Sequence, residues 1–179
     1  MDMNQHSKPG HRIFIIGFMG TGKSHWGQLW AKLHNMSFVD LDAVIEGTEQ
    51  RSVVDIFEKA GEDYFRVKEA SILRDQLEHE HCIISCGGGT ACFHDNMEWM
   101  NEHGFTIYLS ATAPYILKNV LDEKEKRPLV KNINEAELLF FIEQKLKERI
   151  PFYNQANLIL DAETLHENSL KDISGQQFK

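Results

Sequence analysis

The segment Gly17–Ser24, which reads GFMGTGKS, constrains the fold of this chain more than any other feature. It follows the apolar run Ile13–Ile16 and precedes a helix-like stretch that begins at Trp26. The pattern G-x-x-x-x-G-K-[ST] between a strand and a helix is typical of a phosphate-binding loop, whose backbone N–H groups wrap a polyphosphate. We therefore expect Lys23 to reach the β- and γ-phosphates of a nucleotide and Ser24 to bind Mg²⁺.

Four other short apolar segments look like further strands. They are Ser37–Asp40, Cys82–Ser85, Thr106–Leu109 and Asn157–Leu160. Longer stretches with helical signals separate them; for example, Ser52 and Asp55 form a capped helix start, as do Asn134 and Glu137. Strands that alternate with helices build a parallel sheet covered on both faces. The sequence therefore predicts an α/β fold with a five-stranded parallel sheet flanked by helices, and 179 residues fit one domain.

Composition excludes several classes of function. The formal net charge of −8 argues against a broad surface for nucleic acid or for an anionic membrane, so local cations must hold any anionic ligand. No apolar run approaches the roughly 18 residues of a spanning helix, and the first residues lack the apolar core of a signal peptide. We expect a cytoplasmic protein with weakly ordered tails at about residues 1–11 and 168–179.

The three cysteines do not suggest a disulfide framework. Cys82, Cys86 and Cys92 are odd in number and lack a C-x-x-C pair, which also argues against a structural zinc site. The histidines of the His79–His81 segment do not match a zinc-binding spacing. We expect reduced thiols.

Two carboxylates follow the second predicted strand. Asp40 and Asp42 are two residues apart, and side chains alternate along a strand, so both should lie on one side of the ligand-binding edge. One would then serve Mg²⁺ through water, and the other would bind an acceptor hydroxyl. The alternative is that an aspartate here caps the next helix.

A glycine triplet follows the third predicted strand. Gly87, Gly88 and Gly89 leave the backbone open to close approach, so that it can offer N–H donors to a ligand. The alternative interpretation is a bare turn.

Taken together, these motifs identify a family. The chain resembles the shikimate kinases, small enzymes of the nucleoside-monophosphate-kinase type, from about Ile13 to Ala156. The motifs are GFMGTGKS, Asp40-x-Asp42, Gly61-Glu62-x-x-Phe65-Arg66-x-x-Glu69, Gly87-Gly88-Gly89, Arg127-Pro128-Leu129 and Arg149-x-Pro151-x-Tyr153-x-x-Ala156. The resemblance implies a P-loop fold with a mobile lid at about residues 118–133. It also implies transfer of the γ-phosphoryl group of ATP to the 3-hydroxyl of shikimate, on the chorismate route to aromatic amino acids.

The resemblance also assigns the site residues. The nucleotide would be bound by Gly20, Thr21, Gly22, Lys23, Ser24, His25 and Arg127. Mg²⁺ would be held at Ser24 and Asp40. Shikimate would be bound by Asp42, Arg66, Gly87, Gly88, Gly89 and Arg149. The catalytic groups would be Lys23, Asp42 and Arg127.

The residue chemistry agrees with this assignment. Arg66 and Arg149 are guanidinium groups suited to a bidentate grip on a carboxylate. Their sequence spacing alone would favour a surface ion pair on a helix, and it is their position in the family's motifs that reverses this preference. The segment 118–122 holds no arginine, whereas relatives carry one there against the adenine, and Lys118 or Lys124 are the candidate substitutes. ATP and shikimate are the expected partners of a monomer.

Two other functions use similar residues. A gluconate-type sugar-acid kinase shares the phosphate-binding loop and also needs cations for a carboxylate. A kinase-like module that binds nucleotide and regulates a partner without transferring phosphate would share the loop as well.

Overall fold

The computed structural model describes residues 12–122, 133–166 and 169. The predicted tails at 1–11 and 168–179, apart from residue 169, lie outside the described residues. So does most of the predicted lid at 118–133, including Arg127 and Lys124.

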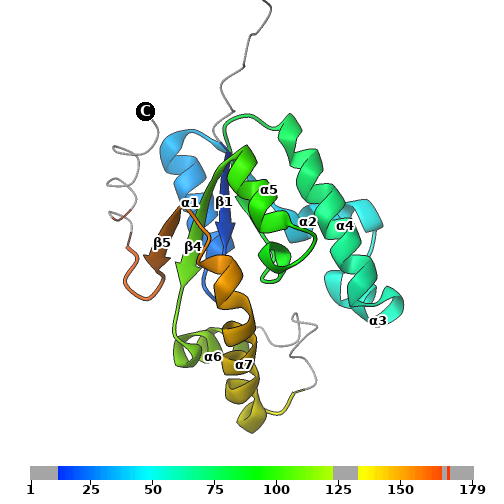
Figure 1. Ribbon diagram of the computed structural model, residues 1–179, viewed down its shortest axis with the longest axis vertical. Helices are drawn as coiled ribbons and strands as arrows, with labels where there is room; N and C mark the ends of the chain where they lie inside the picture. The colour runs from blue at the N-terminus through cyan, green and yellow to red at the C-terminus, as the bar shows by residue number, and fades with distance from the viewer. Residues whose placement is uncertain (1–11, 123–132, 167–168, 170–179) are drawn as a thin grey trace, which may run out of the picture.

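A parallel sheet of five strands forms the centre of the molecule (Figure 1). The strands are β1 (Arg12–Ile16), β2 (Ser37–Asp40), β3 (Cys82–Ser85), β4 (Phe105–Ser110) and β5 (Leu158–Asp161). Their order across the sheet is β2-β3-β1-β4-β5, and every neighbouring pair is parallel. The predicted five-stranded parallel sheet is therefore confirmed. Because β1 lies in the middle, the loop that follows it lies at the centre of the carboxyl edge.

Helices cover both faces of this sheet. Two helices pack on opposite sides of it, namely α1 (Lys23–His34) and α5 (Asn96–His103) (Figure 1). The other helical elements are α2 (Leu41–Glu49), α3 (Val53–Ala60), α4 (Glu62–Asp75), η1 (Gln76–Glu78), η2 (Thr90–Cys92), α6 (Ala113–Leu121) and α7 (Glu135–Tyr153). In β1, Ile13 and Ile15 pack with α1, while Phe14 and Ile16 pack with the helices of the other face. This alternation explains why the four residues Ile13–Ile16 of the strand are all apolar.

Both predicted capping pairs are present. The Ser52 hydroxyl accepts the N–H of Asp55 at the start of α3, at 3.1 Å. The Asn134 side chain accepts the N–H of Glu137 at the start of α7, at 3.0 Å. Each pair satisfies a backbone donor that the first turn of a helix leaves without a partner.

The prediction for Asp42 was wrong in its geometry. Strand β2 ends at Asp40 and α2 begins at Leu41, so Asp42 lies in the first turn of a helix and not on a strand. The physical reason is that the Asp40 carboxylate accepts the N–H of Ala43, which starts the helix immediately. The capping alternative is therefore correct for Asp40.

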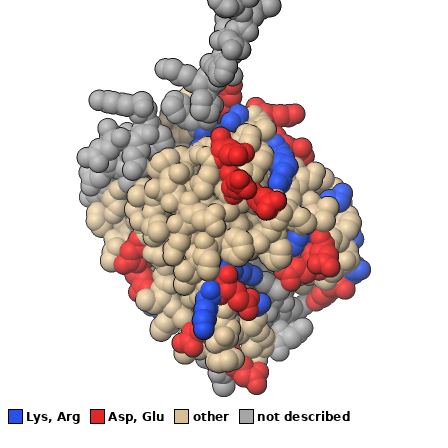
Figure 2. Space-filling model, in the orientation of Figure 1, with Lys and Arg blue, Asp and Glu red and all other residues tan. Residues whose placement is uncertain are grey.

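The surface of the molecule carries charges of both signs. On the face drawn in Figure 2, Asp and Glu side chains lie in several groups with Lys and Arg interspersed. Within the described residues, no helix is long and apolar enough to cross a membrane.

All three cysteines are free thiols, and Cys82 and Cys86 are buried.

Candidate active site

A cleft of about 440 Å³ opens at the carboxyl edge of the sheet. The segments that meet there are the loop after β1, the start of α2, the end of β3 and the end of α6. Its walls are formed by Gly20, Gly22, Lys23, Ser24, His25, Asp40, Asp42, Ser85, Cys86, Gly87, Gly88, Asn119 and Asp122. Nine of the sequence-predicted site residues thus lie around one space, at the edge where ligands bind in α/β sheets.

The loop after β1 has the conformation of a phosphate cradle. Gly20 and Gly22 have φ values of +79° and +84°, a conformation that side chains other than glycine rarely adopt. Gly22 precedes α1, so the positive end of that helix faces the cleft. The ammonium group of Lys23 donates to the carbonyl of Phe18 at 2.9 Å. The Thr21 hydroxyl also donates to Phe18, at 2.8 Å, and is buried, so its side chain supports the loop from within.

The two predicted metal-binding residues are in direct contact. The Ser24 hydroxyl donates to the Asp40 carboxylate at 2.6 Å and lies 3.1 Å from the Ser85 hydroxyl. Sequence reasoning missed Ser85, although it is the last residue of β3 and such positions border the cleft. Within the described residues, no three or more His, Cys, Asp or Glu side chains are grouped to hold a metal ion.

The glycine triplet is explained by close packing. A β-carbon at Gly87 would lie 2.8 Å from a Glu69 oxygen and 3.0 Å from an Asp42 oxygen. One at Gly88 would lie 3.2 Å from the backbone nitrogen of Met19, and one at Gly89 only 2.5 Å from Nη2 of Arg66. None of the three has a positive φ. The segment therefore needs glycine because side chains and backbone approach it from every side, which the bare-turn interpretation does not explain.

Arg66 lies in a buried cluster beside this segment. It is 4% exposed, and its Nη1 donates to the Glu69 carboxylate at 2.8 Å. Its Nε and Nη2 both donate to one oxygen of Glu62, at 3.1 and 2.9 Å. Burial lowers the pKa of Arg66, but the charges and hydrogen bonds of Glu69 and Glu62 outweigh this effect and raise it. Arg66 is therefore paired, as the ion-pair alternative held, but it is not on the surface.

Glu69 belongs to the Gly61–Glu69 motif, and the sequence by itself assigns it no role. It is fully buried, and its second oxygen accepts the Thr90 hydroxyl at 2.6 Å. It therefore connects Arg66 on α4 to the residue that follows the glycine triplet. The signal available in the sequence was its position three residues after Arg66, since residues at that spacing are neighbours on a helix.

Arg149 approaches the glycine triplet from the opposite helix, α7. Its Nη1 donates to the Gly88 carbonyl at 3.1 Å, and its guanidinium lies over the ring of Phe18. The Tyr153 hydroxyl donates to the same carbonyl, an anchoring contact that sequence reasoning missed. A second cavity of about 240 Å³ lies beside Arg149. Its walls are formed by Glu62, Cys92, Phe93, Lys145, Glu148, Arg149 and Phe152.

Near the end of α6, the side chain that borders the cleft and contacts the phosphate-binding loop is an amide and not a lysine or arginine. Asn119 borders the main cleft, and its side-chain nitrogen donates to the carbonyl of Gly20 at 2.8 Å. Asp122 also borders the cleft, whereas Lys118 is not among the described residues that line it. The α6 side chain that contacts the phosphate-binding loop is therefore a neutral amide.

One thiol borders the cleft but is not suited to nucleophilic chemistry. Burial strongly raises the pKa of Cys86, and the nearby carboxylate of Glu69 adds to the effect. The thiol therefore stays protonated at neutral pH.

The phosphate-binding loop after β1 and the strand order β2-β3-β1-β4-β5, with the cleft at the carboxyl edge, define the class of small-molecule kinases with a nucleoside-monophosphate-kinase-like P-loop fold. The sequence model of the family described as shikimate kinase matches residues 19–175. The chain belongs to the shikimate kinase family, and it is an ATP-dependent kinase.

Similar proteins agree with this assignment. A shikimate kinase from Parabacteroides distasonis is 42% identical over 169 residues, which cover 94% of this chain and 98% of that protein. The crystal structure of a shikimate kinase from Bacteroides thetaiotaomicron has a TM-score of 0.86 at 37% identity, covering 92% of this chain and 96% of that one. A shikimate kinase from Acinetobacter baumannii in complex with shikimate has a TM-score of 0.82 at 28% identity, with 94% and 96% covered.

A gluconokinase shares the fold only. The protein from Sinorhizobium meliloti has a TM-score of 0.56 at 16% identity, covering 90% of this chain and 87% of that one. The fold alone therefore does not distinguish the two kinase classes, whereas the family model and the more similar relatives do.

Proposed function

We propose that this protein transfers the γ-phosphoryl group of MgATP to the 3-hydroxyl of shikimate. The observation that carries the proposal is that three side chains from different helices meet at the segment 87–89. Asp42 packs against Gly87, Arg149 donates to Gly88, and Arg66 packs against Gly89. A small ring with hydroxyls and one carboxylate needs such a site, because it needs hydroxyl acceptors at one end and guanidinium groups at the other.

The nucleotide would occupy the main cleft. The N–H groups of the loop and Lys23 would bind the phosphates, with Gly20, Gly22 and His25 at the wall. Thr21 would contribute its backbone, since its hydroxyl is used within the loop. Arg127, which lies outside the described residues, is proposed to neutralise charge on the transferring group.

Mg²⁺ is proposed as the cofactor. The hydroxyl of Ser24 and the carboxylate of Asp40 are hard oxygen donors in contact with each other, which is the donor type that Mg²⁺ takes together with water and phosphate oxygens. When bound, the ion would neutralise charge on the phosphates. Asp42 would hold the attacking hydroxyl, and because phosphoryl transfer has a loose transition state, orientation is the larger part of that role.

The oligomeric state, domain and location follow as proposals. The described residues of the proposed site do not require a second subunit, so we propose a single-domain monomer. The free thiols of Cys82, Cys86 and Cys92 and the use of ATP fit the reducing cytoplasm.

The test is ADP release with MgATP and shikimate, gluconate or no acceptor, with the product identified by mass. We expect turnover with shikimate alone and a product heavier by one phosphoryl group. The Lys23→Met variant is the matched control for contaminating kinases and should lose this activity. Stimulation by gluconate would support the sugar-acid kinase instead, and no stimulation by either would support the binding module.

A further inference from the structure

The guanidinium of Arg66 cannot be reached by a ligand in this structure. Its side chain is 5% exposed, with the rings of Phe57, Phe65 and Phe93 at 5.7, 5.1 and 4.6 Å from its central carbon. The backbone at Gly89 leaves no room for even a β-carbon beside Nη1 and Nη2. If Arg66 is to bind the substrate carboxylate, one of its present neighbours must move.

The neighbour that can move is Glu62. Glu69 is fully buried and is also tied to Thr90, whereas the Glu62 side chain is 40% exposed in the first turn of α4. Glu62 covers the Nε and Nη2 edge of Arg66, which is the edge with two parallel N–H groups that a carboxylate prefers. Because the Glu62 carboxylate is 40% exposed, water can solvate it once it leaves Arg66, so displacing Glu62 costs less than displacing the buried Glu69.

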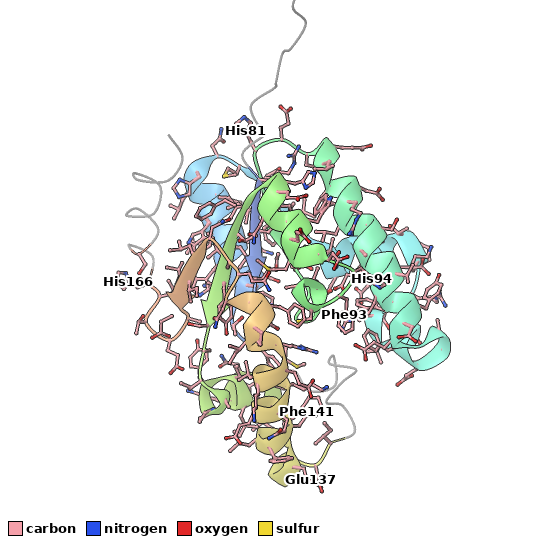
Figure 3. The ribbon with its side chains drawn as sticks, in the orientation of Figure 1. His81, Phe93, His94, Glu137, Phe141 and His166 are labelled. Atoms are coloured by element: carbon pink, nitrogen blue, oxygen red, sulfur yellow. The ribbon has the colours of Figure 1, made fainter. Side chains whose placement is uncertain are left out.

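The cavity beside Arg149 also reaches Glu62. Glu62 and Arg149 both form its walls, together with Phe93, which Figure 3 shows between the α4 and α7 sides of the molecule. Lys145 in the same wall is paired with Glu148 at 2.6 Å. A carboxylate that binds Arg149 from this cavity would therefore meet Glu62 on its way to Arg66.

We propose that Glu62 is an internal carboxylate that occupies the substrate-binding edge of Arg66 and that the substrate carboxylate displaces it. This inference rests on the proposed function and adds a specificity-determining residue to it. A buried guanidinium needs a negative partner, because an uncompensated buried charge is costly. A carboxylate ligand can replace Glu62 in that role, whereas an uncharged analogue of the same shape cannot.

Shikimate can bind Arg66 only in the fraction of the enzyme in which Glu62 does not cover it. The apparent Kd for shikimate is therefore the intrinsic Kd divided by that fraction. Because the Arg66 end of the pair is buried and the Glu62 end is 40% exposed, we take the upper end of the range for solvent-accessible ion pairs, which favours the covered state by about fivefold. The apparent Kd is then raised by about the same factor. Removing the Glu62 charge while Glu69 still holds Arg66 should therefore tighten shikimate binding about fivefold. A role for Glu62 that is only structural would weaken binding or leave it unchanged.

The experiment is calorimetric titration of the nucleotide-free protein with shikimate and with its methyl ester, which lacks the charge. The wild type is compared with Glu62→Gln and with Asp63→Asn, a matched loss of charge at an exposed position in the same helical turn. We expect Glu62→Gln to bind shikimate about fivefold more tightly, with ester binding unchanged and Asp63→Asn like the wild type. Urea denaturation of each variant verifies that it is folded.

Three results would overturn the inference: equal or weaker shikimate binding by Glu62→Gln, an equal gain for the ester, or the same gain in Asp63→Asn. Each of these leaves the proposed function intact if the wild type binds and phosphorylates shikimate. A wild type that neither binds nor phosphorylates shikimate would overturn the proposed function and this inference together.

Discussion

Replacing Glu69 with glutamine tests whether its buried charge holds the substrate side of the site together. Glu69 is fully buried and makes two bonds, to Arg66 at 2.8 Å and to the Thr90 hydroxyl at 2.6 Å. Glutamine keeps the shape, and its oxygen can face Arg66 while its amide nitrogen faces Thr90. The change therefore removes charge and reverses one hydrogen bond without leaving a cavity.

The magnitude follows from burial. Breaking a buried ion pair by removing one partner costs about 3–5 kcal/mol, and because Glu62 still contacts Arg66 we take the lower end, about 3 kcal/mol. For a chain of this size, that loss corresponds to a fall in Tm of about 6–12 °C. The same change at Glu62, whose side chain is 40% exposed, should cost less than about 1 kcal/mol.

The assay is urea denaturation of wild type, Glu69→Gln and Glu62→Gln, followed by tryptophan fluorescence. Equal m-values would show that the variants unfold from equally compact states, so that the midpoints report stability. If Glu69→Gln lost no more stability than Glu62→Gln, burial would not be the source of the strength of this pair, and the reasoning would be refuted.

Three other measurements test the site and its surroundings. Arg149→Ala should weaken shikimate binding at least about thirtyfold, because it removes charged hydrogen bonds of about 2 kcal/mol, and should change ATP binding little; equal losses in calorimetry would count against its role. Hydrogen bonds from Tyr64 and Arg51 lower the pKa of Glu49 below its ordinary 4.5, so the stability gap between wild type and Glu49→Gln should be full above that pH and shrink as pH falls through the lowered pKa; a gap that grows in acid would contradict this. Burial raises the pKa of Cys92 to about 11. In the native protein at pH 8, its alkylation should therefore be roughly 200-fold slower than that of free cysteine; rapid labelling at Cys92 by mass spectrometry would disprove it.

Much of the fold could be predicted because it is encoded by local patterns. The apolar runs matched the strands to within about one residue, and the capping pairs at Ser52 and Asn134 marked true helix starts. The GFMGTGKS loop was predictable for the same reason, since its glycines and the helix behind it act within a few residues of one another. At Asp42 the local reasoning failed, because two rules competed there and the helix cap at Asp40 prevailed over strand alternation.

The sequence by itself determined which chemical groups the protein has and which strand ends carry them. Only the tertiary structure decided how Arg66 and Arg149 are used. Arg66 lies against Gly89 and Arg149 against Gly88, although 61 residues separate the latter pair. Whether an arginine on a helix is solvated or buried depends on residues that are distant in the sequence. The residues next to the arginine in the sequence do not show which distant ones will pack against it. The burial that makes Glu69 a strong partner of Arg66 and leaves Glu62 a displaceable one exists only once α4, η2 and α7 have packed together.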